Sequence, residues 1–392
     1  MIQASQPIQM KNHKSYIKIL FIASENAAGM IPFAATISNV LGNAGYEIHL
    51  LSISRGELSY LNVIDKNAVH FTNLEYPLTS KKGFFFKFFP LFVYKKIVEI
   101  ISKNEIKYVH FLTCDYTLAS LIFRLKNKVS IVYTVHDLIP HETAKEKSLK
   151  KMFFDKYIQW GCKKITNNAD ILVTCSKEQF YTLQKRYTDK QVCFHQFPSL
   201  VTKNIIEGNA VCPELKNTEK YILFFGRIDG YKGIDLLYNV FIENKIFSDY
   251  TLVIAGKGEL YFERKCDENN VICIDRYIDE MEVKSLYEQA SCVVYPYISA
   301  TMSGVLTLAY AFGTPLLASD IPYFRDNIED GQTGILFKNK DENDLRTKLQ
   351  KLLFETDLQQ MKHKQKKIYE QHYSFKSLER EMESIYNKKT QK

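Results

Sequence analysis

Short apolar runs alternate with longer amphipathic stretches along the whole chain. In the first half, the near-continuous apolar runs lie at Ile17–Ala23, Tyr46–Ser52, Tyr108–Leu112, Ser130–Val135 and Ile171–Thr174. Such runs are typical of strands that are covered on both faces, as in a parallel sheet with helical crossovers. The first helix is expected from about Ile31 to Asn43 and ends before Gly45, because glycine readily adopts the left-handed conformation that stops a helix. The pattern predicts an α/β domain.

The second half repeats this pattern. Further strands are predicted at Tyr221–Gly226, Thr251–Ala255, Val271–Ile274 and Cys292–Tyr295. Strand-breaking residues between Pro198 and Asn204 divide the chain into comparable parts, and an amphipathic helix is predicted at Ser374–Lys389. We therefore predict two doubly wound α/β domains, at residues 1–200 and 201–373, which face a cleft and are followed by a C-terminal helix in residues 374–392.

Composition agrees with a folded protein of two domains. The chain has 392 residues, of which 46% are hydrophobic and 24% charged. It contains no uninterrupted apolar stretch of the roughly 18 to 20 residues that a membrane-spanning helix needs, so we expect a cytoplasmic protein. The eight cysteines are scattered without a C-x-x-C pair, and we expect reduced, mostly buried thiols.

The net charge of +8 favours an anionic partner. Its densest basic and aromatic segment is Lys81–Lys96, where phenylalanines alternate with Lys81, Lys82, Lys87, Lys95 and Lys96. Aromatic rings at headgroup depth and lysines on lipid phosphates would suit a peripheral contact with the inner face of an anionic membrane. The alternative is a buried helix start with a solvated lysine rim. No nucleic-acid-binding motif accompanies the charge, so we expect no nucleic-acid partner.

The most informative segment is Phe225–Leu237, in which a predicted strand enters a glycine turn. Gly226 lets the backbone approach a ligand, and Arg227 and Lys232 project from the turn that follows. A guanidinium fork and a compact ammonium together suit the two phosphates of a nucleoside diphosphate. The alternative is an exposed turn in which both cations are solvated.

Phe225–Leu237 resembles the donor-phosphate motif of glycosyltransferase family 4, whose members are retaining enzymes with the GT-B fold of two Rossmann-like domains. Other segments within residues 16–389 also resemble this family: Leu41–Leu50, Thr134–Asp137, Gly256–Gly258, Tyr277–Ile278 with the predicted helix Asp279–Ala290, Ala311–Asp320 and Asp330–Phe337. The resemblance implies that the C-terminal helix crosses back to pack on the first domain.

The resemblance also assigns roles to residues. It implies that Arg227 and Lys232 bind the donor diphosphate and that His136 lies at the cleft floor near the transferred sugar. The donor-binding residues would be Gly226, Gly256, Tyr277, Ile278, Ser303, Gly304 and Val305, and Gly29 would lie on the acceptor side. His136 follows a predicted strand, where ligands of open parallel sheets bind. A structural hydrogen bond is the alternative for His136, and capping of the next turn is the alternative for Asp137.

The chain departs from the family between Tyr295 and Gly313. Two family glutamates that face the donor sugar and the ribose are replaced by Ala300 and Leu308. The loop instead contains Ser303, Gly304 and Val305, whose backbone amides could bind phosphate or sugar oxygens. The alternative is a well-packed strand-to-helix turn.

These observations predict a retaining hexosyltransferase of the glycosyltransferase class. It would move a sugar from a nucleotide-sugar co-substrate to a saccharide acceptor in surface polysaccharide or glycan biosynthesis. A lipid-linked saccharide is one candidate for this acceptor. We expect no cofactor and no metal, because the two cations replace one and no acidic D-x-D-type cluster follows a strand. The alternatives are a catalytically silent nucleotide-sugar-binding partner protein and a nucleotide-sugar epimerase of the same fold.

Overall fold

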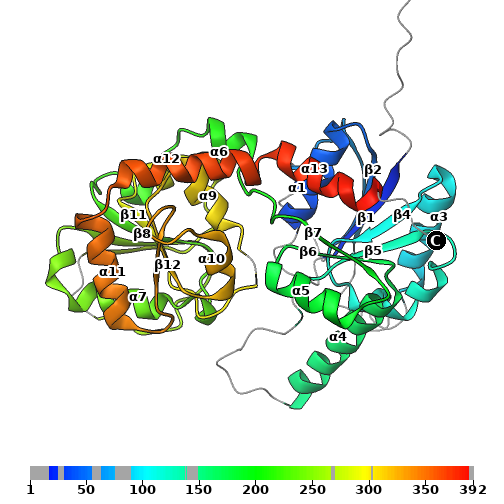
Figure 1. The fold of residues 1–392 in the computed structure, drawn as a ribbon, viewed down its shortest axis with the longest axis horizontal. Helices are drawn as coiled ribbons and strands as arrows, with labels where there is room; N and C mark the ends of the chain where they lie inside the picture. Colours follow the sequence, from blue (N-terminus) through cyan, green and yellow to red (C-terminus); the bar gives the residue numbers. More distant parts are fainter. Residues whose placement is uncertain are drawn as a thin grey trace, which may run out of the picture.

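The computed structural model describes residues 17–24, 31–54, 63–75, 90–136, 138, 149–265, 270–301 and 303–387. They form two parallel sheets, each flanked by helices (Figure 1). The first sheet has the strand order β3-β2-β1-β4-β5-β6-β7, and the second has the order β10-β9-β8-β11-β12-β13. In both sheets the order reverses next to the first strand, which is the doubly wound arrangement. The predicted fold class, two Rossmann-like domains of the GT-B type, is confirmed.

Both sheets are built from strands of three to eight residues. The first contains β1 (Lys18–Ser24), β2 (Glu47–Ser54), β3 (Val69–Glu75), β4 (Tyr108–Phe111), β5 (Ser130–Thr134), β6 (Ile171–Thr174) and β7 (Gln191–Phe194). The second contains β8 (Tyr221–Phe225), β9 (Thr251–Ala255), β10 (Val271–Ile274), β11 (Cys292–Tyr295), β12 (Leu316–Ser319) and β13 (Ile335–Phe337). All neighbours pair in parallel, with Ile19 opposite Ile48 in the first sheet and Ile222 opposite Leu252 in the second.

Helices cover the faces of these sheets. Those associated with the first are α1 (Ile31–Asn43), α3 (Leu91–Asn104), α4 (Leu149–Asn168) and α5 (Lys177–Arg186). The chain then passes through α6 (Lys203–Glu207) to α7 (Ile234–Glu243), α8 (Glu280–Glu288), α9 (Val305–Phe312), α10 (Pro322–Asn327), α11 (Glu342–Phe354), α12 (Leu358–Ile368) and α13 (Phe375–Asn387). The predicted first helix has the bounds of α1.

The strands that the apolar pattern did not predict are β3, β7, β12 and β13. Three of these lie at sheet edges, and in β3 and β7 most side chains are only partly buried. Such a strand needs no continuous apolar run, so its sequence resembles a loop. β12 is fully buried but only four residues long.

The C-terminal helix α13 packs back on the first sheet, as expected for this fold class. Figure 1 shows α12 over the second domain and its continuation into α13 at the first. The Tyr386 hydroxyl is hydrogen-bonded to His110 Nδ1 at 2.6 Å, and the Tyr108 hydroxyl donates to the Tyr386 carbonyl at 3.0 Å. Met382 is fully buried in the same core. The chain therefore connects the two sheets twice, while the predicted domain limits stay a prediction.

The two connections between the sheets are hydrogen-bonded to each other and to the second domain. The side-chain amide of Gln196 donates to Asn327 Oδ1 at 2.7 Å and to the Tyr373 hydroxyl at 2.8 Å. The Ser199 and Tyr369 hydroxyls lie 3.0 Å apart. These contacts join the linker after β7 to the segment between α12 and α13, so both segments form one hinge region.

The expectation of reduced cysteines is wrong for one pair. Cys114 and Cys162 form a disulfide, with Cα atoms 5.9 Å apart. Cys114 follows β4 and Cys162 lies in α4, which packs against the turn that begins at Tyr116. Disulfides are rare in the cytosol, so this bond does not support the predicted cytoplasmic location.

Free thiols at Cys175, Cys193, Cys212 and Cys292 are buried, as predicted. Among the described residues, no helix is both long enough and apolar enough to cross a membrane.

Candidate functional site

Two glycine turns meet at the carboxyl ends of β8 and β9. Gly226 and Gly256 have φ angles of +135° and +148°, which disfavour side chains. A Cβ atom on Gly256 would lie 2.1 Å from the Gly226 carbonyl oxygen, and the Gly226 amide donates to the Ala255 carbonyl at 3.0 Å. Only glycine at position 256 allows the two turns to lie this close. The backbone is therefore open at the edge of the sheet where ligands of this fold class bind.

Lys232 is the buried cation of this site. It ends the short turn Gly230–Lys232 before α7, and its residue surface is only 8% exposed. Its Nζ lies 3.6 Å from the centroid of the Tyr297 ring and 4.9 Å from that of Tyr231. Burial, and to a lesser extent the nearby charge of Arg227, lower the pKa of Lys232 to about 7, although Asp229 opposes the shift. Lys232 is thus poised to gain a proton when an anion binds.

Arg227 is the exposed cation of the pair. It follows Gly226 directly, and its guanidinium contacts the Asp229 carboxylate at 3.2 Å. The Arg227 side chain is 56% exposed, so this ion pair contributes little to stability and can open without much cost. The charge of Arg227 acts on Lys232, so the two cations influence each other electrostatically.

Tyr297 lies among several of the predicted donor residues. The Ser303 hydroxyl lies 3.5 Å from the Tyr297 hydroxyl. A Cβ atom on Gly226 would lie 3.8 Å from both the Tyr297 hydroxyl and Val305 Cγ1. Gly226, Lys232, Ser303 and Val305 therefore surround one buried ring, and we call this group the Tyr297 cluster. The sequence analysis missed Tyr297, although its position just after β11, beside the glycine turn that follows β8, could have indicated it.

The loop before α9 is packed tightly. The Tyr323 hydroxyl donates to the Ser303 carbonyl at 2.7 Å. A Cβ atom on Gly304 would lie 2.6 Å from Leu200 Cγ, and the Leu200 amide donates to Thr307 Oγ1 at 3.1 Å. The interdomain linker thus rests directly on the loop that carries Ser303, so the donor side and the hinge are in contact.

The two positions where the family carries glutamates are apolar and packed. Leu308 is 2% exposed inside α9, and Ala300 packs against the same core. Neither side chain can accept a hydrogen bond from a sugar hydroxyl. Polar recognition by this loop would instead come from its backbone groups and from the hydroxyl side chains of Ser299, Thr301 and Ser303.

Tyr277 and Ile278 differ in exposure. Tyr277 is 75% exposed, whereas Ile278 packs against the core of the second domain. Asp279 then caps α8. Its side chain accepts a hydrogen bond from the Met281 amide at 2.8 Å, and its own amide donates one to the Glu282 carboxylate at 3.1 Å. This capping box fixes the chain direction and leaves the Tyr277 ring available for a ligand.

His136 is held at the end of β5 in the first domain. Its Nε2 lies 2.6 Å from the Leu112 carbonyl oxygen, and its ring meets Phe33 edge-on with centroids 5.0 Å apart. The Gln179 side chain donates to the His136 carbonyl at 2.7 Å. These contacts orient the ring and place it against first-domain residues rather than within the Tyr297 cluster. A catalytic role for His136 therefore stays a prediction.

The remaining predicted residues are only partly described. Gly29, Lys81, Lys82, Lys87 and Asp137 lie outside the described residues. On α3, Lys95 is exposed, and Lys96 pairs with Glu99 at 2.9 Å. Among the described residues, no group of three or more His, Cys, Asp or Glu side chains is arranged to hold a metal ion.

Two family models match the chain. The model for glycosyl transferases group 1 matches residues 212–371, and the model for Glycosyltransferase Family 4 matches residues 29–192, so together they cover most of the sequence. An uncharacterized glycosyltransferase of Methanocaldococcus jannaschii, MJ1178, is 24% identical over 355 residues, which are 87% of this chain and 89% of that protein. The capsular polysaccharide biosynthesis glycosyltransferase CapM of Staphylococcus aureus is 26% identical over 183 residues, which are 44% of this chain and 47% of CapM.

Solved structures share the fold at low sequence identity. Sucrose-phosphate synthase from Thermosynechococcus elongatus has a TM-score of 0.70 at 16% identity, covering 94% of this chain and 98% of that one. Anabaena HepE in complex with UDP-glucose has a TM-score of 0.69 at 13% identity, with the same coverage. WaaG, involved in lipopolysaccharide biosynthesis, has a TM-score of 0.63 at 14% identity, covering 95% of this chain and 100% of that one.

Proposed function

We propose that this chain, which belongs to the family 4 type of glycosyltransferases, transfers a hexose with retention from a nucleotide-diphosphate sugar to a saccharide acceptor. The observation that carries this proposal is the Tyr297 cluster together with the adjacent Arg227 and Gly256. A buried lysine, an exposed arginine and two glycine turns lie together at the carboxyl ends of β8 and β9. This arrangement suits a diphosphate, since it offers two cations and accessible backbone at one edge of the sheet.

The proposed mechanism is driven by the leaving group. The bond between the anomeric carbon and the diphosphate oxygen breaks, and its electron pair goes to the diphosphate, whose charge Arg227 and Lys232 stabilise. The acceptor hydroxyl attacks from the same face and forms the new glycosidic bond. Its proton passes to the departing phosphate oxygen, so no separate protein base is needed. The stereochemistry is then retained.

A uridine nucleotide is the proposed donor carrier. The structural neighbour HepE has been solved with UDP and with UDP-glucose, which supports UDP as the first nucleotide to test. Tyr277 is the proposed partner of the base, because its ring is largely exposed beside the capped start of α8. The role of CapM in capsular polysaccharide biosynthesis supports a surface polysaccharide as the product.

A lipid-linked acceptor at a membrane surface is part of the proposal. On the first domain, Leu91 and Phe123 are 48% and 59% exposed. The Arg124 guanidinium lies 5.7 Å from the Phe123 ring and 6.0 Å from the Tyr94 ring of α3, where Lys95 is also exposed. An exposed aromatic ring and an exposed leucine among basic side chains suit an anionic membrane interface. Co-sedimentation with vesicles that contain an anionic lipid, compared with neutral vesicles, tests this contact.

The proposal includes no cofactor and no metal. The positive charge that a divalent cation would supply to a departing diphosphate is assigned to Arg227 and Lys232. Turnover is therefore expected to continue in excess EDTA. Loss of activity in EDTA, restored by Mg²⁺ or Mn²⁺, would contradict this part of the proposal.

A catalytically silent partner protein is the alternative with a specific observation behind it. Ala300 and the buried Leu308 provide no carboxylate for the donor sugar or the ribose. An epimerase is less well supported, because proton abstraction needs ionisable groups near the sugar, and the Tyr297 cluster contains Lys232 as its only ionisable group besides the tyrosine itself.

The deciding experiment presents the purified protein with a panel of UDP-, GDP- and ADP-sugars. Thermal stabilisation and the slow release of nucleoside diphosphate are recorded together. We expect one donor to be hydrolysed, and expect the hydrolysis to be lost in Arg227→Ala and Lys232→Ala. Stabilisation without turnover, even with detergent-solubilised lipid acceptors, would instead indicate the silent binding protein. Interconversion of sugar epimers would indicate the epimerase.

A further inference from the structure

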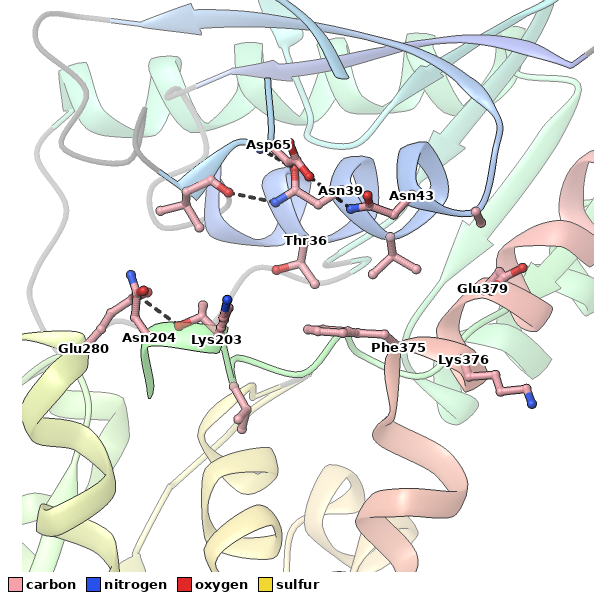
Figure 2. Close-up of a pocket in the computed structure, with 15 residues that line it drawn as sticks. Thr36, Asn39, Asn43, Asp65, Lys203, Asn204, Glu280, Phe375, Lys376 and Glu379 are labelled. Atoms are coloured by element: carbon pink, nitrogen blue, oxygen red, sulfur yellow. Dashed lines mark hydrogen bonds between the residues drawn. The ribbon is translucent and has the colours of Figure 1, made fainter. Parts of the chain in front are cut away.

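A cavity of 680 Å³ lies at the hinge between the two domains (Figure 2). Its walls come from five parts of the chain: α1 of the first domain, the segment before β3 that contains Val63 and Asp65, the linker at Val201–Asn204, the start of α8 and the start of α13. Arg227, Lys232, Ser303 and His136 are not among the residues that line it. The cavity is therefore separate from the site to which we assign donor binding.

One wall presents amides in fixed positions. Asn39 of α1 donates to the Val63 carbonyl at 2.7 Å and accepts from the Asp65 amide at 2.9 Å. Asn43, one turn further along the same helix face, donates to Asp65 Oδ2 at 3.3 Å. Figure 2 shows these three side chains together along one side of the cavity. Polar groups that are already oriented lose little freedom when a ligand binds.

A second wall presents an oriented carboxylate. Glu280 Oε2 accepts from the Thr202 hydroxyl and from the Asn204 side-chain amide, each at 3.0 Å. Figure 2 shows Glu280 and Asn204 on the opposite side of the cavity from Glu379. A ligand between these walls would touch the first domain, the linker and the second domain together.

An aromatic ring completes the cavity. Phe375, the first residue of α13, is 46% exposed and reaches beneath α1 in Figure 2. Val40, Val63 and Val201 provide further apolar surface. An exposed ring beside a few oriented amides and carboxylates suits a ligand with one apolar face and many hydroxyl groups, since specificity in such pockets comes from a small number of placed polar groups.

Charge and size restrict the ligand class. The lining contains three acidic residues, Asp65, Glu280 and Glu379, and two basic residues, Lys203 and Lys376. Figure 2 shows Lys376 extending away from the centre of the cavity. This balance disfavours phosphates and other anions. The volume falls within the roughly 300 to 1,000 Å³ of small-molecule sites. We propose that this cavity is a second carbohydrate-binding site, which takes a neutral disaccharide or a segment of a neutral oligosaccharide.

The position of the cavity gives such binding a consequence. The linker that lines it continues into Leu200, which packs against Gly304 in the loop before α9. A saccharide held between α1, Glu280 and Phe375 would therefore restrain both chain connections beside the Tyr297 cluster. Binding here requires neither donor nor turnover, so the inference stands apart from the transfer reaction.

Isothermal titration of the full chain with maltose, cellobiose, lactose and diacetylchitobiose tests the proposal, with glucose 1-phosphate as the anionic control. Phe375→Ala and Glu280→Gln are each expected to weaken the binding of the neutral disaccharide about tenfold or more, as loss of an aromatic contact or of a charged hydrogen-bond acceptor would. The matched controls are Phe354→Ala, a similarly exposed phenylalanine at the end of α11, and Glu288→Gln, an exposed glutamate at the other end of α8. Neither control is expected to change saccharide binding.

UDP is titrated into the same variants to separate this site from the donor site. We expect UDP affinity to be unchanged in all four, which also shows that they fold. Absence of binding by every neutral disaccharide would overturn the proposal, as would binding of glucose 1-phosphate alone. Binding that survives Phe375→Ala and Glu280→Gln would place the saccharide elsewhere and overturn it too. A failure of UDP to bind the wild-type protein would count against the proposed transfer function and not against this site.

Discussion

The ammonium of Lys232 lies 3.6 Å from the centroid of the Tyr297 ring. Lys232 follows β8 and Tyr297 follows β11, and these two strands are neighbours in the second sheet. The ring face attracts the cation, an effect that reaches about 2 kcal/mol when the pair is desolvated. Tyr297 therefore offsets part of the cost of burying the charge and holds Lys232 where we expect the donor diphosphate.

Replacing Tyr297 by leucine should weaken diphosphate binding. Without the ring the charged form of Lys232 loses its attraction, its pKa falls further, and UDP affinity is expected to drop about tenfold. Tyr297→Phe keeps the ring face and is the matched control, expected to bind UDP within about twofold of wild type. Equal UDP affinity for the leucine and phenylalanine variants would show that the ring does not act on Lys232.

The depressed pKa of Lys232 predicts a pH-dependent affinity for UDP. With a pKa of about 7 the free protein has lost most of this proton at pH 8.5, whereas a bound diphosphate restores it. Binding above pH 7.5 should then take up as much as about one proton, and the affinity should fall by up to about tenfold per pH unit. Titration in buffers of different ionisation enthalpy measures this uptake, and Lys232→Met should abolish it.

The depressed pKa of Lys232 also predicts that folding stability rises with pH, opposite to the fall in UDP affinity. Because the folded-state pKa lies below the unfolded value, burying Lys232 costs most below pH 7, where the group is charged in both states. This cost is relieved as the pH rises from about 7 towards about 10.5. The stability gained by Lys232→Met should accordingly be larger at pH 6 than at pH 9, measured by urea unfolding. A gain independent of pH would contradict the assigned pKa.

Arg227 can be compared with a matched arginine elsewhere in the same domain. Arg227 pairs with Asp229 at 3.2 Å and is 56% exposed, while Arg325 pairs with Asp320 at 2.7 Å and is 58% exposed. If Arg227 stabilises the departing diphosphate, Arg227→Ala should lower turnover about 10²- to 10³-fold, whereas Arg325→Ala should leave it near wild type. An equal, small effect of both substitutions would reduce Arg227 to a surface ion pair.

Local sequence patterns predicted the parts of the site that lie within one segment. Gly226, Arg227 and Lys232 are all set by the turn that follows β8, and a strand, a glycine and two cations can be read directly from the chain. Most interior strands of both sheets, with the exception of the short β12, were found for a similar reason, because burial on both faces requires continuous apolar runs.

What escaped prediction depends on contacts between distant segments. The role of Tyr297 arises because β8 and β11 pair, and the disulfide arises because α4 packs next to the end of β4. The hinge cavity needs residues from Thr36 to Glu379 to meet. No spacing within one segment signals these contacts, so only the folded chain reveals them.

Gly256 should tolerate no side chain. Its φ of +148° is one that side chains rarely adopt, and a Cβ atom would lie 2.1 Å from the Gly226 carbonyl oxygen, so the two glycine turns would have to separate. Gly256→Ala is expected to lower the free energy of unfolding by about 2 kcal/mol or more and to weaken UDP binding, since the Gly226 turn carries Arg227. Gly230→Ala is the matched control, because a Cβ atom there would meet nothing within 4 Å, and its stability should change by less than about 1 kcal/mol. Urea unfolding and UDP titration check both variants, and equal behaviour of the two would mean that the close approach of the glycine turns is not required for the site.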